Sequence, residues 1–307
     1  MSKIAFIFPG QGAQYVGMGN DFYDAYEEAR EVYRKAKEAT GLDIEALCFT
    51  ENDKLNITEY TQIAMLTTEV ALLKVLESKG VHADVCAGLS LGEYGALAAA
   101  GVMELESLFQ LIRLRGIYMQ EAYPVGGAMT AVLGLDAGVI ESTLKGIDGI
   151  VSIANYNCPG QIVITGETKA VEMAATALQE AGAKRCIPLK VSGPFHSALL
   201  TDAGKKLGEA LSKVETHKPQ IPYVCNVEAD YVTQEDSIKE LLEKQVSHSV
   251  RWQQSVEKMI ADGTDTFIEI GPGKTLTGFM RKINKDVKVM NVDKLADMEK
   301  VLEELGC

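Results

Sequence analysis

A serine flanked by glycines is the strongest chemical signal in this sequence. The run Gly88-Leu89-Ser90-Leu91-Gly92 fits the pattern G-x-S-x-G, which forms a sharp turn with an exposed serine hydroxyl when it follows a strand and opens a helix. An apolar segment at 81–87 precedes the run and an alanine-rich segment at 91–100 follows it. Because the pattern is short, an ordinary glycine-rich turn is the alternative. We interpret Ser90 as a candidate nucleophile.

A serine nucleophile needs a general base, and four histidines are available. His196 follows a predicted strand at 184–191 and precedes a predicted helix, so it falls at the carboxyl end of a strand, where the sites of α/β proteins assemble. The other three lie before the nucleophile strand or in polar stretches: His82, His217 and His248. We therefore take His196 as the candidate base, with a surface or packing role as the alternative. No acidic residue stands out as its partner, and a backbone carbonyl is an alternative way to orient the imidazole.

An arginine interrupts the apolar face of the predicted helix 105–122. Arg115 shares that face with five apolar or aromatic residues: Leu108, Leu111, Ile112, Tyr118 and Met119. A guanidinium in such surroundings is costly unless an anion meets it. A substrate carboxylate, bound by two hydrogen bonds, is one such anion. A structural ion pair with a buried carboxylate of the protein is the alternative.

Glycines after the first predicted strand indicate where a developing negative charge would bind. Gly10-Gln11-Gly12 follows the strand 3–8, and glycines at a strand end leave backbone N–H groups accessible. Together with the N–H of Leu91, such groups are suited to form an oxyanion hole. The run is also close to a dinucleotide-binding pattern, but Tyr15 stands where the last glycine is needed.

The composition excludes several classes of function. The 307 residues carry a net charge of −13, which argues against binding to nucleic acid. The six cysteines are scattered without C-x-x-C, and no H-x-x-x-H occurs, so we expect free thiols and no metal site. The apolar run that begins the chain meets Pro9 and is too short for a signal peptide. We expect a cytoplasmic protein.

Strands alternate with helices along most of the chain, which predicts an α/β fold with a parallel sheet. The middle differs: its predicted order is strand, helix, two strands, helix, strand, the ferredoxin-like pattern. We therefore predict a catalytic body of residues 1–124 and 197–307 with an inserted subdomain at 125–196. The predicted strands are 3–8, 81–87, 128–134, 150–155, 161–165, 184–191, 223–227 and 266–270. The predicted helices are 20–40, 58–79, 91–100, 105–122, 136–145, 168–181, 198–213, 238–245 and 253–261, before a final short strand–helix unit.

With these residues in view, the chain resembles the malonyl-CoA:acyl carrier protein transacylases of type II fatty acid synthesis. It is also similar to the acyltransferase domains of polyketide synthases. The resemblance covers nearly the whole chain, and its markers are Phe8-Pro9-Gly10-Gln11-Gly12, Gly88 to Glu93, Arg115-Gly116 with Met119-Gln120, Asn155-Tyr156-Asn157, Gly193-Pro194-Phe195-His196 and Glu269-Ile270-Gly271-Pro272-Gly273.

The resemblance implies a role for each candidate residue and a ping-pong reaction. It implies that Ser90 is the nucleophile, that His196 is the general base and that Arg115 binds the malonyl carboxylate. The oxyanion donors would be the N–H groups of Gln11 and Leu91, the Gln245 carbonyl would orient His196, and Phe195 resembles the residue before the base in malonyl-selective members. The implied substrates are malonyl-CoA and phosphopantetheinylated acyl carrier protein, with no bound cofactor. The implied fold is an α/β-hydrolase-like body with a ferredoxin-like insert.

The chain departs from the family pattern at two positions. Leu89 stands where the family usually has histidine before the nucleophile, and Ile63 replaces a proline in the Thr-Gln-Pro run. Two other classes of function share part of this site. A serine thioesterase or hydrolase would have the same serine and histidine without needing Arg115, and a non-catalytic docking subunit of a synthase would be expected to lose one of the three.

Overall fold

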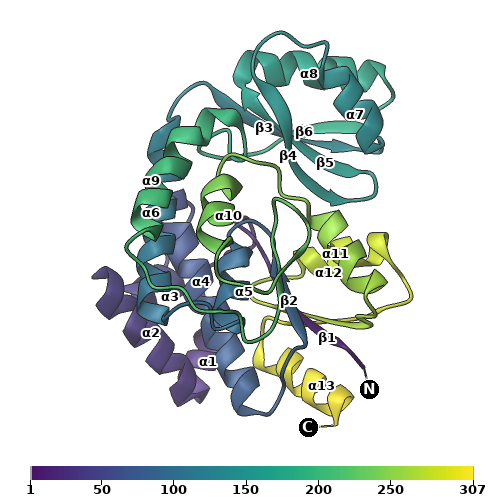
Figure 1. Cartoon of the computed structure of the whole chain (residues 1–307). Coiled ribbons are helices and arrows are strands. Elements are labelled where there is room, and N and C mark those ends of the chain that lie inside the picture. The colour runs from purple at the N-terminus through teal and green to yellow at the C-terminus, as the bar shows by residue number, and fades with distance from the viewer. Residues whose placement is uncertain (1, 307) are drawn as a thin grey trace.

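The computed structural model describes residues 2–306 and contains two separate sheets (Figure 1). The first has the strand order β10-β9-β1-β2-β7-β8, in which only β8 is antiparallel to its neighbour. The predicted α/β class with a parallel sheet is therefore confirmed. Its strands are β1 (Ile4–Phe8), β2 (Val85–Gly88), β7 (Tyr223–Val224), β8 (Tyr231–Val232), β9 (Thr266–Ile270) and β10 (Lys288–Val292).

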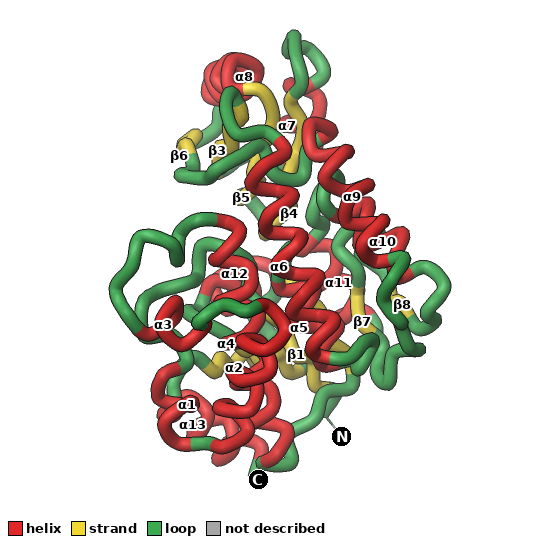
Figure 2. Tube along the Cα trace, turned by 90° about the vertical axis from the view of Figure 1, so that its left-hand side faces the viewer, coloured by secondary structure: helices red, strands yellow, loops and turns green. Residues whose placement is uncertain are grey.

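Helices cover both faces of this sheet because its strands alternate their side chains between two cores. Phe6 and Phe8 of β1 join the core formed with the long helices α2, α4 and α6, whereas Ala5 and Ile7 pack with α11 and α12 on the other face. Figure 2 shows α6 running along the body beside α9. The helices of this part are α1 (Asn20–Ala25), α2 (Glu27–Thr40), α3 (Ile44–Phe49), α4 (Thr58–Ser78), α5 (Gly92–Ala99), α6 (Leu105–Ala122), the 3₁₀ turn η1 (Ala198–Leu200), α9 (Thr201–Leu211), α10 (Ile238–Gln245), α11 (Trp252–Ala261), α12 (Thr275–Ile283) and α13 (Leu295–Leu305).

The second sheet is antiparallel, has the order β4-β5-β3-β6, and lies at the top of Figure 1 with α7 and α8 on one face. It joins the body through β4, where the N–H of Tyr156 donates to the carbonyl of Val250 and the N–H of Val250 donates to Ala154. The division at residues 125 and 196 stays a prediction. The elements are β3 (Gly127–Leu133), α7 (Ala137–Leu144), β4 (Val151–Cys158), β5 (Gln161–Glu167), α8 (Thr168–Glu180) and β6 (Arg185–Pro188).

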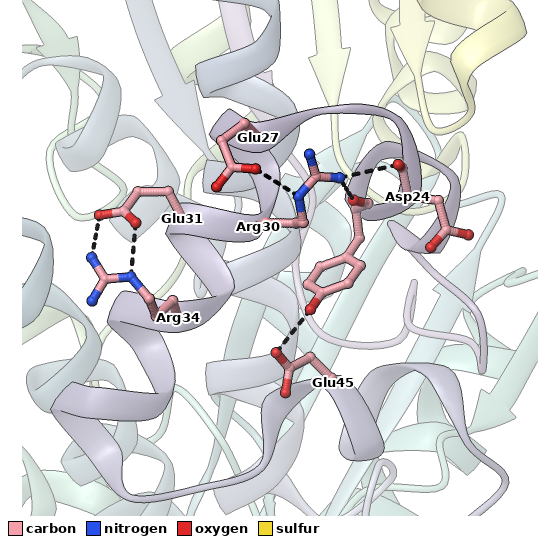
Figure 3. Close-up of polar contacts among 7 residues, drawn as sticks. Asp24, Glu27, Arg30, Glu31, Arg34 and Glu45 are labelled. Atoms are coloured by element: carbon pink, nitrogen blue, oxygen red, sulfur yellow. Dashed lines mark hydrogen bonds and ion pairs between the residues drawn. The ribbon is translucent and has the colours of Figure 1, made fainter.

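The long helix predicted near the N-terminus is in fact two helices, because Tyr26 is extended, with φ −127° and ψ 134°. Arg30 stabilises this break. Its Nη1 donates to the carbonyl oxygens of Tyr23 and Asp24 at the end of α1, at 2.9 and 3.1 Å, and its Nε pairs with Glu27 (Figure 3). The last carbonyl groups of a helix have no backbone N–H partner within that helix. Arg30 therefore supplies the hydrogen bonds that these carbonyls would have received from backbone N–H groups in a continuous helix.

Other predicted elements are shorter than expected, and two helices were not predicted. The strand at 184–191 ends at Pro188, which frees the segment up to His196 to turn toward the body. The helix predicted at 198–213 begins with the 3₁₀ turn η1. Helices α3 and α12 were not predicted from the sequence. The N-terminus of α12 is satisfied by Glu269, whose carboxylate accepts from the N–H groups of Leu276 and Thr277 at 2.9 and 2.7 Å.

No helix among residues 2–306 is long and apolar enough to cross a membrane. Five cysteines in this range are free thiols, namely Cys48, Cys86, Cys158, Cys186 and Cys225, and Cys307 lies outside the described residues.

A carboxyl group of α4 is buried behind the loops that end β1 and β9. Glu69 is fully buried, and neither of its oxygens has a hydrogen-bond partner among residues 2–306. Burial, with a further contribution from the nearby Glu269, raises the pKa of Glu69 well above its usual 4.5. The folded protein therefore holds this proton to a higher pH than the unfolded chain does. The contribution of Glu69 to folding stability therefore falls as the pH rises above about 4.5.

We expect Glu69→Gln to be more stable than the wild type at pH 8 and nearly equal to it at pH 5. Glutamine keeps the shape of the neutral carboxyl group but has no proton to lose. The measurement is the melting temperature of both proteins from pH 5 to pH 8. The difference should widen with pH by at least about 2 °C, which corresponds to roughly 1 kcal/mol in a large domain. The exposed Glu299→Gln is the matched control, and a constant difference across the range would contradict the prediction.

Candidate active site

Two glycines allow the turn that presents Ser90. The serine lies between β2 and α5 with φ at 56°, in the left-handed region. A Cβ atom at Gly88 would lie 1.9 Å from the carbonyl carbon of Gly92, and one at Gly92 would lie 2.1 Å from the carbonyl oxygen of Phe8. Neither backbone atom can move aside, so only glycine fits at both positions. The predicted strand–turn–helix context of G-x-S-x-G is confirmed.

The hydroxyl of Ser90 and the imidazole of His196 form a hydrogen bond of 2.7 Å between Oγ and Nε2. On the other side of the ring, Nδ1 lies 2.8 Å from the backbone carbonyl oxygen of Gln245. A carbonyl only accepts, so Nδ1 carries the proton and Nε2 has its lone pair directed at the serine. This geometry suits the removal of a proton from Ser90.

Burial lowers the pKa of His196 to about 4, and the positive charge of Arg115 lowers it further in the same direction. The hydrogen bond to the Gln245 carbonyl opposes the shift without cancelling it. His196 is therefore neutral, and able to accept a proton, across the whole range around neutral pH.

Arg115 is buried and bound by neutral oxygens. Its Nη1 donates to the side-chain oxygen of Gln62 at 2.7 Å, and its Nη2 donates to that of Gln245 at 2.9 Å and to Ser90 Oγ at 3.2 Å. Its Nε is buried and has no partner among residues 2–306. Its bonds thus go to amides and a hydroxyl, and the structural ion pair considered as an alternative is not observed in the described part of the chain.

The loop after β1 lies against the turn that carries Ser90. A Cβ atom at Gly10 would lie 2.7 Å from the carbonyl oxygen of Leu89, so this close approach also requires glycine. Gln11 and Leu91 both border the cavity in front of Ser90. Within residues 2–306 neither backbone N–H donates a hydrogen bond. Both groups are therefore free to donate to a ligand atom beside the serine.

The cavity has a volume of about 250 Å³ and opens between the two sheets. Ser90, His196, Arg115 and Gln62 form a polar group in its lining, the cavity floor, whereas most of the remaining lining residues, its walls, are apolar. Phe195, buried next to His196, forms part of the wall, as does Leu89. The remaining wall residues include Met119, Met129, Val163, Leu189, Val191 and Phe279, with Asn155 and Asn157 among them.

Three buried polar residues near the site were not found from the sequence. Gln62 and Glu93 each occupy an apolar stretch of helix, a signal of the kind that identified Arg115. Asn226 carries no such signal, because it follows a two-residue strand. The histidines set aside from the sequence, His82, His217 and His248, are exposed and do not line the cavity. No cluster of residues suited to a metal ion occurs between residues 2 and 306.

Comparison with known proteins identifies close relatives over the full length. A family model of the acyl transferase domain matches residues 5–301. The malonyl CoA-acyl carrier protein transacylase of Bacillus subtilis is 43% identical over 99% of this chain and 98% of its own length. The solved structure of the malonyl CoA-acyl carrier protein transacylase from Clostridium perfringens has a TM-score of 0.96 at 45% identity, covering 99% of this chain and 98% of that one. The structure of MCAT from Streptococcus pneumoniae has a TM-score of 0.95 at 48% identity and covers 98% and 100%.

We expect the reactivity of Ser90 toward phenylmethylsulfonyl fluoride to stay nearly constant between pH 5.5 and pH 8. A base with a pKa near 4 is deprotonated throughout this range. A histidine of ordinary pKa, about 6.5, would lose about nine-tenths of its base form by pH 5.5. The measurement is the second-order rate of inactivation, corrected for the reagent's own hydrolysis. His196→Ala should be slower by roughly 10²–10⁴-fold, and a wild-type midpoint near 6.5 would contradict the lowered pKa.

Proposed function

Because this chain belongs to the acyl transferase family, among the malonyl-CoA:acyl carrier protein transacylases, we propose that it moves a malonyl group from malonyl-CoA to the phosphopantetheine thiol of an acyl carrier protein. The observation that carries this proposal is the position of Arg115. Its guanidinium is buried, lies 3.2 Å from the hydroxyl of Ser90, and is bound by neutral groups. Such a cation would favour an acyl group that carries a free carboxylate in addition to its thioester carbonyl.

In the first half-reaction Ser90 becomes acylated. His196 Nε2 takes the hydroxyl proton while Oγ attacks the thioester carbonyl of malonyl-CoA, and the carbonyl oxygen becomes an oxyanion. The N–H groups of Gln11 and Leu91 are the donors for this charge. The carbon–sulfur bond then breaks, the imidazolium returns its proton to the sulfur, and coenzyme A leaves as the free thiol. The product is a malonyl ester on Ser90.

The second half-reaction reverses these roles. The phosphopantetheine thiol of the carrier protein gives its proton to His196 and attacks the ester carbonyl. The same two N–H groups stabilise the second oxyanion, and Ser90 leaves with the proton from the imidazolium. The enzyme is restored and the carrier holds the malonyl group as a thioester.

Arg115 would do two things in this scheme. Its planar guanidinium can bind the free malonyl carboxylate by two hydrogen bonds, which the low-polarity surroundings strengthen. It also donates to Ser90 Oγ, which leaves the hydroxyl proton directed at His196. Burial lowers the pKa of Arg115, opposed by the negative charges of Tyr94 and Glu93 when these are ionised, and a bound carboxylate would favour the charged form further.

The apolar walls of the cavity would protect the ester from water. Transfer of the malonyl group must be faster than hydrolysis of the ester. The apolar walls offer few positions at which a water molecule could be held for attack, since they include Met119, Met129, Val163 and Phe195. Phe195 narrows the space beside the base, which suits malonyl over branched homologues. Leu89 adds apolar surface where the family usually places a histidine.

The arrangement of the chain supports the finer description of the fold. The strand order β4-β5-β3-β6 with the sequence order βαββαβ is that of a ferredoxin-like subdomain, inserted at residues 125–196. The serine turn after β2 in a mostly parallel sheet supports an α/β-hydrolase-like body of residues 1–124 and 197–307. Free thiols in the described residues and a coenzyme A substrate support a place in the cytoplasm.

A thioesterase or hydrolase is the second candidate, since Ser90 and His196 would serve it equally. The position of Arg115, however, favours a substrate with a free carboxylate. A docking subunit without catalysis is disfavoured, because the nucleophile, the base and both oxyanion donors are all present around one cavity.

Brief exposure to malonyl-CoA should leave one malonyl group on the wild type and none on Ser90→Ala. The measurement is intact mass, followed by addition of phosphopantetheinylated carrier protein, which should remove the label from the enzyme and acquire it. Ser192→Ala, changed in the loop before the base, is the matched control and should label normally. Release of free malonate without carrier at the same rate would identify a hydrolase, and labelling of Ser90→Ala would contradict the choice of nucleophile.

Arg115→Ala should abolish the preference for malonyl over acetyl. The wild type should use acetyl-CoA poorly, because the buried guanidinium would be left without an anion. By analogy with broken buried pairs, this amounts to roughly 3–5 kcal/mol, or about 10²–10⁴ in kcat/KM. Methylmalonyl differs by one methyl group, so discrimination at Phe195 should be weaker, about 1–3 kcal/mol. The measurement is kcat/KM for the three thioesters.

Arg113→Ala is the control for this comparison. Arg113 lies on the same helix but pairs with Glu59, away from the cavity. It should keep the wild-type preference. If Arg115→Ala also keeps it, Arg115 is a structural residue and the carboxylate is recognised elsewhere.

A further inference from the structure

Asn226 is buried behind the turn that carries Ser90 and contacts it from the side of β7. Its side-chain oxygen accepts a hydrogen bond from the N–H of Ser90 at 2.7 Å, and its side-chain nitrogen donates to the carbonyl of Gly88 at 2.6 Å. It does not line the cavity. Asn226 is thus placed to act on the nucleophile without touching the substrate.

The amide of Asn226 extends the sheet beyond the point where its backbone pairing ends. Strands β2 and β7 pair through Cys86 with Tyr223 and Ala87 with Val224, and no backbone pair follows. A side-chain amide has one carbonyl and N–H donors, as a peptide group does. By accepting from Ser90 and donating to Gly88, it supplies the next pair of hydrogen bonds in place of backbone.

This support acts at the strained residue of the site. Ser90 has φ at 56°, a conformation that costs a non-glycine residue on the order of 1–3 kcal/mol and persists only where the surroundings hold it. On the β1 side, the N–H of Leu89 donates to the carbonyl of Phe8. On the β7 side, Asn226 is the group that holds the turn.

Asn226 is also tied to the residues that position the base. Its backbone N–H donates to Glu93 Oε2 at 3.2 Å, and the same oxygen accepts from Gln245 Nε2 at 2.6 Å. Gln245 Nε2 lies 2.9 Å from the carbonyl oxygen of Ser90. The nucleophile, Asn226 and the residue that orients His196 therefore form one closed set of buried hydrogen bonds.

We propose that Asn226 is a positioning residue of the acyl transfer: its side-chain amide fixes the backbone of Ser90, and so places Oγ against His196. The inference rests on the proposed role of Ser90 as nucleophile. The N–H of Leu91, the next residue, is placed by the same contact. A displacement of about 1 Å at a reacting group can reduce a rate by roughly 10²-fold.

Two variants at this position separate the two halves of the contact. Asn226→Ala removes both hydrogen bonds to the serine turn, together with the longer one, 3.4 Å, that Gln245 Nε2 donates to the Asn226 oxygen. Asn226→Asp keeps an acceptor for the Ser90 N–H, but an ionised carboxylate cannot donate to Gly88. A protonated carboxyl group can do both, as the amide does. The charged or titratable groups around this position are Glu93 and Tyr94 on α5, Arg115 on α6, His196, and Tyr223 and Cys225 beside β7, and all of them are the same in both variants. Burial raises the pKa of Tyr94, Tyr223 and Cys225, so these three stay neutral from pH 5.5 to pH 8, whereas the titration of Glu93 is common to both variants and the wild type.

The rate of Ser90 acylation is measured at saturating malonyl-CoA in a single turnover, and again with phenylmethylsulfonyl fluoride, from pH 5.5 to pH 8. Asn226→Ala should be slower by about 10²-fold with both reagents, with a KM for malonyl-CoA close to that of the wild type because Arg115 and the walls are intact. Asn226→Asp should be equally slow at pH 8 and should recover at least about tenfold toward pH 5.5, whereas Asn226→Ala should not.

Val232→Ala, a buried change on the neighbouring β8, controls for lost stability and should react at the wild-type rate despite a lower melting temperature. Rates of both Asn226 variants within about twofold of the wild type would overturn the proposal, as would a loss expressed mainly in KM. An Asn226→Asp rate that does not recover on acidification would also overturn it. A wild type that reacts with the sulfonyl fluoride but not with malonyl-CoA would instead refute the proposed function, and the sulfonyl fluoride rates would still test Asn226.

Discussion

Gln245 is the residue that holds Ser90, His196 and the buried Arg115 in one arrangement. Its backbone carbonyl accepts from His196, its side-chain oxygen accepts from Arg115, and its side-chain nitrogen donates to Ser90 and to Glu93. It ends α10 and is fully buried. The backbone carbonyl of Gln245 thus meets His196 where many serine enzymes have an acidic residue, and it adds no negative charge beside the imidazole.

The absence of an acid from that position has an electrostatic consequence. Arg115 remains the dominant charge at the cavity floor, and its field acts with burial to keep His196 neutral. The nearest acid of the network is Glu93, one hydrogen bond behind Gln245. Burial raises the pKa of Glu93 to about 7, against the opposing effect of its bonds to Gln245 and Asn226 and of the charge of Arg115. The charge of Arg115 therefore favours the binding of an anionic ligand group in the cavity.

The sequence predicts those features that depend on residues close together along the chain. The serine turn follows from local steric limits at Gly88 and Gly92, and α6 has the predicted bounds because its apolar face is unbroken apart from Arg115. The break at Tyr26 is invisible to periodicity, since Arg30 stabilises it from the next helix. The contact between Asn226 and Ser90 joins residues 136 positions apart, so no local pattern indicates it. His196 binds the backbone carbonyl of Gln245, and because every residue type has this group, the sequence cannot identify such a partner by residue type.

Part of the cavity wall comes from a different part of the chain than Ser90 and Arg115 do. Ser90 and Arg115 belong to elements around the parallel sheet, as do the wall residues Met119 and Phe279. Met129 and Val163 belong to the antiparallel sheet, which is hydrogen-bonded to the body through β4. Substitutions on β3 and β5 can therefore reshape the acyl pocket while the hydrogen-bonded set beneath it stays intact. The preference for an acyl group can therefore change in evolution through substitutions in the antiparallel sheet alone. The same substitutions are available for engineering that preference.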